Sequence, residues 1–354
     1  MNELQVVHLC RGRDWRGGER QVRLLARMLA DRSDLSQLIA TGRTSRLAGV
    51  ALSDGQRVLP LTWAQAYDPR AWLSLVRQLH RLQRRGAGLL LHAHDSHGLA
   101  LGLLAATLLR LPLVATRRSM SVAGPLWRRP RRVIAISRAV EQELLESGVS
   151  RRRIVRISSA IDLAVVRRVV PTQDPREETL IAVGALTPEK GHATLIDAVE
   201  LVARTHPGIR LRIFGEGTER GALEAQAGRA GLGSRVVLAG ETETAAAQIA
   251  AAQLFIQPSH REALGTAVLD AMALGVPVVA SDTGGLTELL DGGAGMLVPP
   301  KDPVALAAAI EMLLASQQLR TEIAAAARAR VAEFDAPGMA DRVVEVYRSA
   351  LGDT

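Results

Sequence analysis

The sequence contains few aromatic residues, one cysteine and two lysines. Phe, Trp and Tyr make up 3% of the 354 residues, whereas 47% are hydrophobic, so a packed core must be aliphatic and rich in alanine. Cys10 is the single cysteine, which excludes an internal disulfide and fits a reducing compartment. No apolar run reaches the roughly 18 residues of a membrane span, and Met1–Leu9 lacks the pattern of a signal peptide. We therefore expect a soluble cytoplasmic protein.

Positive charge gathers in the first half of the chain. Residues 1–170 hold 29 Arg and 12 Asp or Glu, a net charge of +17. Residues 171–354 hold 15 Lys or Arg and 24 Asp or Glu, a net charge of −9. Halves of opposite charge indicate two domains with different partners, and the first half favours an anionic one. A nucleic-acid-binding protein is one alternative, but we find no aromatic platform, helix-turn-helix or zinc pattern, and so expect no nucleic acid partner.

Short aliphatic runs alternate with amphipathic stretches along both halves. Leu4–Leu9 and Leu89–His92 predict strands, and Gly18–Ala30 and Pro69–Arg84 predict helices. A second series of the same kind begins at Leu180–Val183. This alternation is typical of a parallel sheet covered by helices.

A polar segment separates the two series. Val169–Thr179 has two prolines and several charges, and it predicts a linker. The fold class is therefore α/β, with two doubly wound Rossmann-like domains over residues 1–170 and 171–335. Ligands of such sheets bind at the carboxyl ends of the strands, which predicts a site in an interdomain cleft.

The strongest motif is Gln257–Gly285, QPSHREALGTAVLDAMALGVPVVASDTGG. We expect a strand to end at Gln257, a polar loop to present Glu262, and a helix to begin near Gly265, where its free N–H groups favour phosphate. Glu262 can accept hydrogen bonds from sugar hydroxyls, and Asp270, about two turns along the helix, can hold a ribose diol. A capped helix with a solvated Asp270 is the alternative. The backbone groups expected beside the ligand belong to Ala263, Leu264, Gly265 and Thr266.

These residues resemble the donor-binding motif of retaining glycosyltransferases of family 4, also called group 1, which have the two-domain GT-B fold. The family motif has two Glu separated by seven residues, followed by Ala-Met-Ala-x-Gly-x-Pro-Val-Val-Ala. This sequence has Glu262, then Asp270, then AMALGVPVVA. The resemblance implies that Glu262 contacts the donor sugar and that Asp270, one methylene shorter than Glu, contacts the ribose.

Two further segments resemble the same domain of this family. VGALTPEKG (Val183–Gly191) resembles the stretch whose Arg and Lys hold the nucleotide diphosphate; Lys190 is present, and Ala185 stands in place of the Arg. A Lys at the leaving diphosphate stabilises charge that grows in the transition state, although an ordinary surface lysine is the alternative. RIFGEG resembles the turn beneath the base. The resemblance thus adds Gly184 and Gly215 to the expected substrate-binding residues.

Three segments of the first half complete the expected site. GGERQVRLLARMLADR resembles the Gly-Gly-x-Glu helix opening, where Gly17 and Gly18 would let donor phosphate or acceptor pass, unless they form a plain tight turn. LLLHAHDSHG has three histidines in six residues, and we expect His94 to bind at the cleft rim rather than to hold a metal. VATRRSM places Arg117 and Arg118 where many relatives carry a His, which suggests an anionic contact.

The resemblance implies a function for the whole chain. Residues 336–354 resemble the closing helix that returns to the N-terminal domain. We expect a retaining, metal-independent transferase without a cofactor, in which Lys190 and Glu262 serve catalysis and UDP is the favoured donor base. The positive half suits an anionic glycan or lipid-linked acceptor, as in lipopolysaccharide or cell-envelope synthesis, and peripheral attachment to the inner face of the cytoplasmic membrane. A sugar-nucleotide epimerase and a catalytically weak donor-binding relative are the alternatives.

Overall fold

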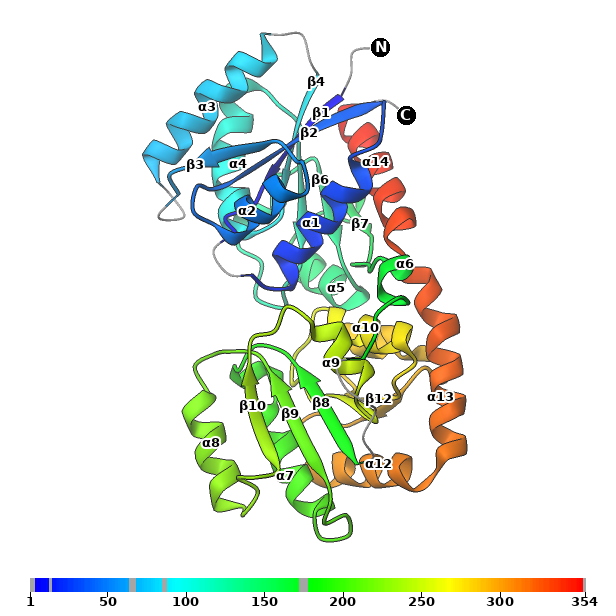
Figure 1. The fold of residues 1–354 in the computed structure, drawn as a ribbon. Coiled ribbons are helices and arrows are strands. Elements are labelled where there is room, and N and C mark those ends of the chain that lie inside the picture. Colours follow the sequence, from blue (N-terminus) through cyan, green and yellow to red (C-terminus); the bar gives the residue numbers. More distant parts are fainter. Residues whose placement is uncertain (1–3, 13–14, 64–67, 85–87, 172–177, 353–354) are drawn as a thin grey trace. The chain divides into compact units, whose positions relative to one another are not determined.

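The structure is a computed structural model that describes residues 4–12, 15–63, 68–84, 88–171 and 178–352. The chain divides into two compact units (Figure 1). Unit 1 comprises residues 1–160 and 336–354, and unit 2 comprises residues 161–335. Among the described residues, no helix is both long and apolar enough to cross a membrane.

Unit 1 contains a seven-stranded sheet with the order β3-β2-β1-β4-β5-β6-β7, and all its neighbouring strands are parallel. The strands are β1 Leu4–Leu9, β2 Leu35–Gly42, β3 Val58–Leu61, β4 Gly88–Ala93, β5 Leu113–Arg117, β6 Arg132–Ala135 and β7 Ile154–Arg156. The interior strands are almost entirely buried because helices cover both faces of a parallel sheet.

Side-chain caps define where several helices of unit 1 begin. Ser45, Asp68, Asp95 and Ser137 each accept a hydrogen bond from a backbone N–H of the first turn that follows. The helices are α1 Gly17–Leu29, α2 Arg46–Ser53, α3 Pro69–Gln83, α4 Ser96–Leu109, η1 Pro125–Arg128, α5 Arg138–Glu146, η2 Arg151–Arg153 and α14 Ala336–Leu351.

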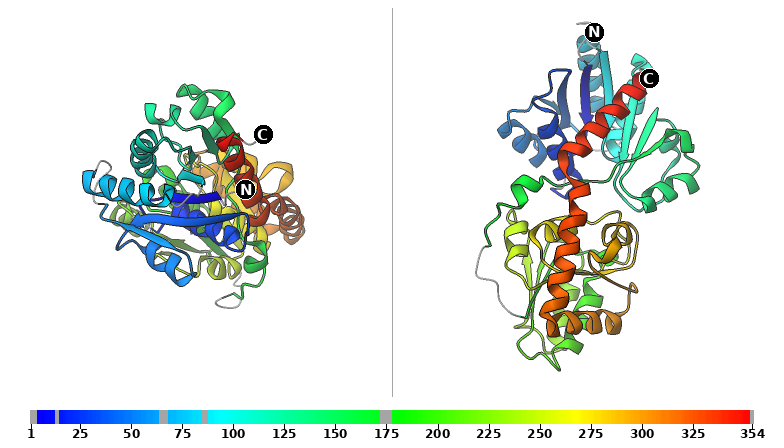
Figure 2. Two further views of the ribbon diagram at one scale, coloured as in Figure 1. Left: turned by 90° about the horizontal axis from the view of Figure 1, so that it is seen from above. Right: turned by 90° about the vertical axis from the view of Figure 1, so that its right-hand side faces the viewer.

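The last helix, α14, belongs to unit 1 although the whole of unit 2 precedes it in the sequence. It packs against α1 (Figure 2), and its apolar face joins a core cluster with β1, β4 and β5. Among the described residues, Tyr347 is the largest fully buried side chain, and it lies in this cluster.

Unit 2 contains a six-stranded parallel sheet with the order β10-β9-β8-β11-β12-β13. The strands are β8 Thr179–Val183, β9 Arg210–Phe214, β10 Val236–Gly240, β11 Leu254–Gln257, β12 Val278–Ser281 and β13 Met296–Val298. The helices are α6 Leu163–Val166, η3 Pro188–Lys190, α7 His192–Val202, α8 Arg220–Arg229, α9 Ala245–Ala250, α10 Thr266–Leu274, α11 Gly285–Leu289, η4 Asp291–Gly293, α12 Pro303–Ala315, α13 Gln317–Arg330 and η5 Val331–Phe334. One aliphatic cluster fills the space between this sheet, α7 and α12.

The expected architecture of two doubly wound parallel sheets is confirmed, and the differences are local. The edge strand β3 was not predicted, because Pro60 interrupts its apolar run and proline is tolerated only at a sheet edge. After Pro303 the chain forms two helices, α12 and α13, which meet at Ser316, and the Ser316 side chain caps α13. Most of the predicted linker 169–179 falls on residues 172–177, which lie outside the described residues.

Candidate functional site

Two loops at the carboxyl ends of neighbouring strands in unit 2 bring the predicted catalytic residues together. Lys190 ends η3, which follows β8, and Glu262 lies in the loop that follows β11. Lys190 Nζ lies 2.7 Å from Glu262 Oε2. The Lys190 side chain is 24% exposed and that of Glu262 is 9% exposed, so this ion pair is partly shielded from water.

Two polar side chains that the sequence analysis did not single out hold the Glu262 carboxylate. Ser259 Oγ donates a hydrogen bond to Glu262 Oε2 at 3.1 Å, and Gln257 Nε2 donates to the same oxygen at 3.4 Å. Both residues are buried, and Gln257 also donates to Ser259 Oγ. They lie within the QPSHRE stretch, so their proximity to Glu262 in sequence was the available signal. All three contacts are made to Oε2, which fixes the direction of the carboxylate.

Close backbone packing supports the Glu262 loop. The N–H of His260 donates to Glu189 O at 2.8 Å, and the N–H of Gly285 donates to Glu262 O at 3.0 Å. A Cβ at Gly284 would lie 1.9 Å from Glu262 O, and Gly284 has φ of 56°. A side chain at Gly284 would therefore displace the Glu262 peptide. Contacts between backbone atoms thus hold the loops after β8, β11 and β12 together.

The predicted phosphate-binding turn begins α10. Gly265 is the N-cap residue with φ of 102°, and no side chain caps the helix. Ala263 and Leu264 are buried, so they can offer a ligand only backbone atoms, whereas Gly265 and Thr266 are partly exposed. Asp270 is half-buried on α10, four residues after Thr266 and therefore on the same side of the helix. A helix N-terminus of this kind favours an anion.

The predicted glycines after β8 and β9 contact each other. A Cβ at Gly215, whose φ is 148°, would lie 1.9 Å from Gly184 O, so the two turns approach at backbone distance. His192 packs next to Gly184, since a Cβ at Gly184 would lie 3.7 Å from His192 Nε2. His192 is fully buried, and this burial lowers its pKa to about 4. The packing of the two turns is thus one reason for glycine at position 215, whatever ligand binds there.

In unit 1, the opening of α1 lies beside Arg118. Gly17 and Gly18 are the first residues of α1, and a Cβ at Gly18 would lie 4.0 Å from Arg118 Cδ. Arg118 Nη1 donates to Ser159 Oγ at 3.1 Å, and burial lowers the pKa of Arg118 to about 10, so the guanidinium stays charged near neutral pH. Gly17, Gly18 and Arg118 are therefore neighbours at the carboxyl end of β1 and β5.

The structure does not support the expected substrate contact of Arg117. This side chain is 3% exposed, and its guanidinium lies 3.3 Å from a carboxylate oxygen of Glu143. It also donates to the backbone carbonyl and the hydroxyl of Ser121, and it stacks over Trp127 at 4.8 Å from the ring centre. The charge of Arg117 is therefore enclosed by its neighbours within unit 1.

Three histidines form a buried network at β1 and β4. His94 is only 4% exposed, so it does not lie on a rim, and its partners are His8 and His92 rather than the neighbouring His97. His8 Nδ1 lies 3.0 Å from His94 Nε2, and His92 contacts Tyr347 Oη and Thr116 Oγ1 at 2.7 Å each. Burial lowers the pKa of His8 to about 4 and those of His92 and His94 well below the usual value.

This network contains the group of three potential metal ligands found among the described residues. Its ligand nitrogens lie within 4.8 Å of one another. The second ring nitrogen of His8 contacts Gln37 Oε1 at 3.2 Å, so His94 Nδ1 is the one ring nitrogen of the three histidines without a partner among the described residues. The rings bind each other and their surroundings through hydrogen bonds, and the absence of a metal at these histidines stays a prediction.

Comparisons with known proteins identify the family of this chain. Residues 167–330 match the family model described as glycosyl transferases group 1, and residues 15–165 match that described as glycosyltransferase family 4. Glycogen synthase from Mycobacterium tuberculosis is 30% identical over 341 residues, which cover 84% of this chain and 81% of that protein. The chain belongs to the family-4, group 1 glycosyltransferases.

The structures and other relatives agree with this assignment. HepE from Anabaena, solved with UDP and glucose, is 23% identical, with a TM-score of 0.86 over 98% of this chain and all of that one. This likeness confirms the GT-B fold. A phosphatidyl-myo-inositol mannosyltransferase from Mycobacterium tuberculosis is 26% identical over 362 residues, covering 95% of this chain and 94% of that protein. This chain is therefore a glycosyltransferase, and the two relatives named above match it over most of their length.

Proposed function

We propose that this glycosyltransferase moves a sugar from a UDP-sugar to an anionic glycan or lipid-linked acceptor, with retention at the anomeric carbon. The main support is the 2.7 Å contact between Lys190 Nζ and Glu262 Oε2 at the strand ends of unit 2. The choice of UDP follows HepE, which was solved with UDP and glucose. Donor binding is assigned to unit 2 and acceptor binding to unit 1.

Each donor-site residue has a chemical role in this proposal. Lys190 stabilises the negative charge that develops on the departing diphosphate, and the N–H groups at the start of α10 add to this stabilisation. Glu262 Oε1 accepts hydrogen bonds from sugar hydroxyls, while Oε2 keeps its contacts to Ser259 and Gln257. Asp270 accepts hydrogen bonds from the ribose hydroxyls.

The reaction exchanges one bond at the anomeric carbon for another on the same face. The bond to the diphosphate oxygen breaks, and a bond to the acceptor oxygen forms. Negative charge develops on the departing phosphate oxygen as its bond to the anomeric carbon breaks, and Lys190 stabilises this charge in the transition state. The same oxygen then takes the proton of the acceptor hydroxyl, so UDP leaves without an additional charge. We propose that no metal or cofactor takes part, because Lys190 and the helix N-terminus supply the positive charge at the diphosphate.

The acceptor side of the proposal is supported by the charge of the first half of the chain, most of which belongs to unit 1. The +17 net charge of residues 1–170 favours a phosphorylated acceptor, such as a lipopolysaccharide core or a lipid-linked sugar. Arg118, beside Gly18, is the arginine that contacts it. The M. tuberculosis relative named for phosphatidyl-myo-inositol supports a lipid acceptor, and we propose peripheral attachment at the inner face of the cytoplasmic membrane.

The test is a donor screen with wild-type protein, Glu262→Gln and the matched control Glu189→Gln, an exposed side chain next to Lys190. UDP-, GDP- and ADP-sugars are incubated with chelator, with and without phosphorylated acceptors, and the products are separated. We expect release of UDP and an α-linked product from an α-linked donor, with activity lost in Glu262→Gln only. Inverted product or a metal requirement contradicts the mechanism. A new free sugar or sugar nucleotide without acceptor indicates an epimerase, and donor binding without turnover indicates a catalytically weak relative.

A further inference from the structure

Two neighbouring helices of unit 1 carry no acidic residue along their whole length. Helix α3 has the sequence PRAWLSLVRQLHRLQ, and α4 has the sequence SHGLALGLLAATLL. The flanking carboxylates Asp68 and Asp95 accept hydrogen bonds from the first turns of α3 and α4, respectively. Within these two helices, every residue among Asp, Glu, Lys and Arg is therefore an arginine.

The two helices lie on the same face of the sheet. Helix α3 connects β3 to β4 and α4 connects β4 to β5, and right-handed crossovers in the same direction place both helices on one side. They pack against each other (Figure 1), and Gln83 Nε2 donates to Leu109 O at 3.3 Å where both helices end. Helices α1 and α2 connect strands in the opposite direction and cover the other face.

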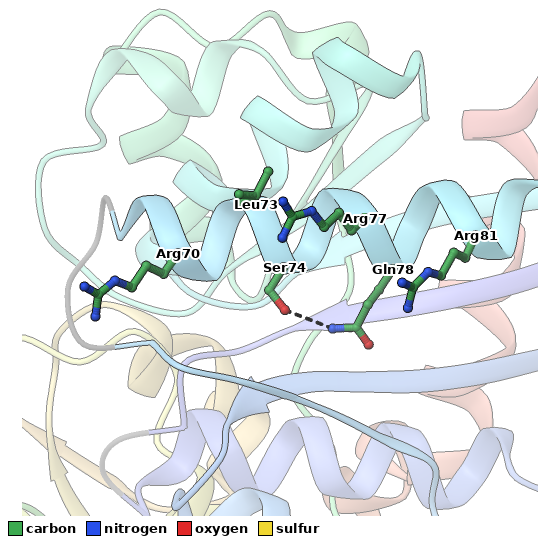
Figure 3. A pocket seen from close by; sticks show the side chains of 6 residues that line it. All are labelled: Arg70, Leu73, Ser74, Arg77, Gln78 and Arg81. Atoms are coloured by element: carbon green, nitrogen blue, oxygen red, sulfur yellow. Dashed lines mark hydrogen bonds between the residues drawn. The ribbon is translucent and has the colours of Figure 1, made fainter.

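Arginines of α3 surround a shallow hollow (Figure 3). The hollow has a volume of about 330 Å³ and is lined by Arg70, Leu73, Ser74, Arg77, Gln78 and Arg81. Within the part of the chain that the structure describes, none of its three guanidinium groups forms an ion pair, whereas Gln78 and Ser74 hydrogen-bond to each other at 3.1 Å. Three unpaired cations along one helix side form a surface that attracts phosphate.

Large apolar side chains are exposed on the same two helices. Leu73 on α3 is 42% exposed, and Leu104 and Leu108 on α4 are 48% and 58% exposed. Leu104 and Leu108 are four residues apart and therefore occupy one side of α4. Single exposed leucines are ordinary on a protein surface, but these three lie on two packed helices that expose no carboxylate of their own.

We propose that this α3–α4 face, formed by Arg70, Leu73, Arg77, Arg81, Leu104 and Leu108, docks on a bilayer that contains anionic phospholipid. The arginines bind lipid phosphates, and the leucines enter the boundary between headgroups and acyl chains. A nucleic acid would use the arginines but leave the leucines in water. The proposal rests on the proposed function only in that a membrane-held acceptor would then lie close to unit 1.

The first test measures binding to vesicles of phosphatidylcholine with and without phosphatidylglycerol, at low and high salt. Arg77→Glu with Arg81→Glu is compared with Arg27→Glu with Arg229→Glu, which change the net charge equally from exposed positions on α1 and α8. We expect salt-sensitive binding only to the anionic vesicles, weakened about 10- to 30-fold by the α3 pair and less than about twofold by the control pair. Equal loss in both pairs, or no binding by the wild type, overturns the proposal.

The second test asks whether the leucines enter the bilayer. Leu108→Trp is compared with Leu52→Trp, because Leu52 on α2 is 61% exposed on the opposite face of the same sheet. With anionic vesicles, we expect a blue-shifted emission and quenching by spin-labelled lipid for Leu108→Trp beyond the wild-type signal, and neither for Leu52→Trp. Equal quenching of the two variants overturns the proposed orientation.

Different results would refute the proposed docking surface and the proposed reaction. Turnover of donor with a water-soluble acceptor reports the reaction alone, and the Arg77→Glu, Arg81→Glu variant should retain it. Vesicle binding without turnover would refute the reaction and leave the docking surface standing. Binding of an oligonucleotide that this variant abolishes, without any vesicle binding, would assign the surface to nucleic acid and refute the proposal.

Discussion

Lys190 and Glu262, 72 positions apart in the sequence, form an ion pair at 2.7 Å across the ends of β8 and β11. The ammonium and the carboxylate each supply the charge that holds the other in place before any ligand binds. Removing either partner leaves the other in a partly buried position, so both binding and local stability depend on the pair.

Replacement of Lys190 tests its role at the leaving group. We expect Lys190→Gln to lower kcat by about 10²–10³-fold, because a charge that stabilises the transition state is lost. Lys301→Gln is the matched control, since Lys301 is the other lysine of the chain and is exposed. Steady-state kinetics with saturating donor measure the effect. Equal kcat values for the two variants would remove Lys190 from the mechanism.

Gly284 is expected to control the position of the Glu262 loop. Gly284→Ala introduces a Cβ 1.9 Å from Glu262 O at a φ of 56°, so we expect a loss of transfer and a destabilisation of at least about 1–3 kcal/mol. In Gly292→Ala, φ is 70° but nothing lies within 4 Å of the new Cβ, so this control measures backbone strain alone. Denaturant unfolding and donor binding are compared. The prediction fails if both variants lose equal stability and bind donor equally.

Alanine substitutions at the adjacent residues Arg117 and Arg118 should have different effects on stability and on acceptor use. Arg117→Ala leaves Glu143 without its buried partner, and we expect a loss of about 2–4 kcal/mol in the free energy of unfolding. Arg118→Ala removes the hydrogen bond to Ser159 but also a charge that burial disfavours, so we expect the free energy of unfolding to change by less than about 1 kcal/mol. The same variant should lower kcat/KM for an anionic acceptor by about tenfold or more. Unfolding curves and acceptor titrations measure the two effects. A reversed order would mean that the contacts of Arg117 and Arg118 have been misassigned.

The buried histidines predict a pH dependence of stability. The pKa values of His8 and His192 are lowered to about 4, below the ordinary value of 6.5. The unfolded chain therefore binds more protons between about pH 4 and pH 6.5, and the free energy of unfolding should fall as pH is lowered through this range. Each histidine contributes up to about 1.4 kcal/mol per pH unit. Unfolding measured from pH 7.5 downward checks this, and His8→Gln should show a smaller slope; an unchanged slope would contradict the assignment.

Chelation tests the metal-independent mechanism and the histidine network together. We expect a chelator to change the transfer rate by less than about 20%. We also expect it to leave the denaturant concentration at the unfolding midpoint unchanged. Added zinc or manganese should raise neither, because the ring nitrogens of His8 and His92 already have protein partners. A rate restored by one metal after chelation would refute the mechanism. A raised unfolding midpoint alone would instead identify the three histidines as a metal site.

Local patterns were sufficient for much of the fold and the donor loop. Alternating apolar runs predicted the parallel sheets, because a buried strand and an amphipathic helix each leave a short-range signature. The stretch around Glu262 predicted the strand end, the polar loop and the glycine at the start of α10, since all three lie within a few residues of one another. These features depend on neighbours in the sequence.

Only the tertiary structure decided which polar side chains are neighbours. Arg117 and Arg118 are adjacent in sequence, yet Arg117 pairs with Glu143 and Arg118 contacts Ser159. His94 joins His8 from another strand, 86 positions away, rather than the nearby His97. Burial and charge pairing are set by contacts between distant segments, and a one-residue step along a strand reverses the side that a residue faces. For this reason the sequence determined the two sheets and the donor loop, whereas packing decided the partners of each charged group.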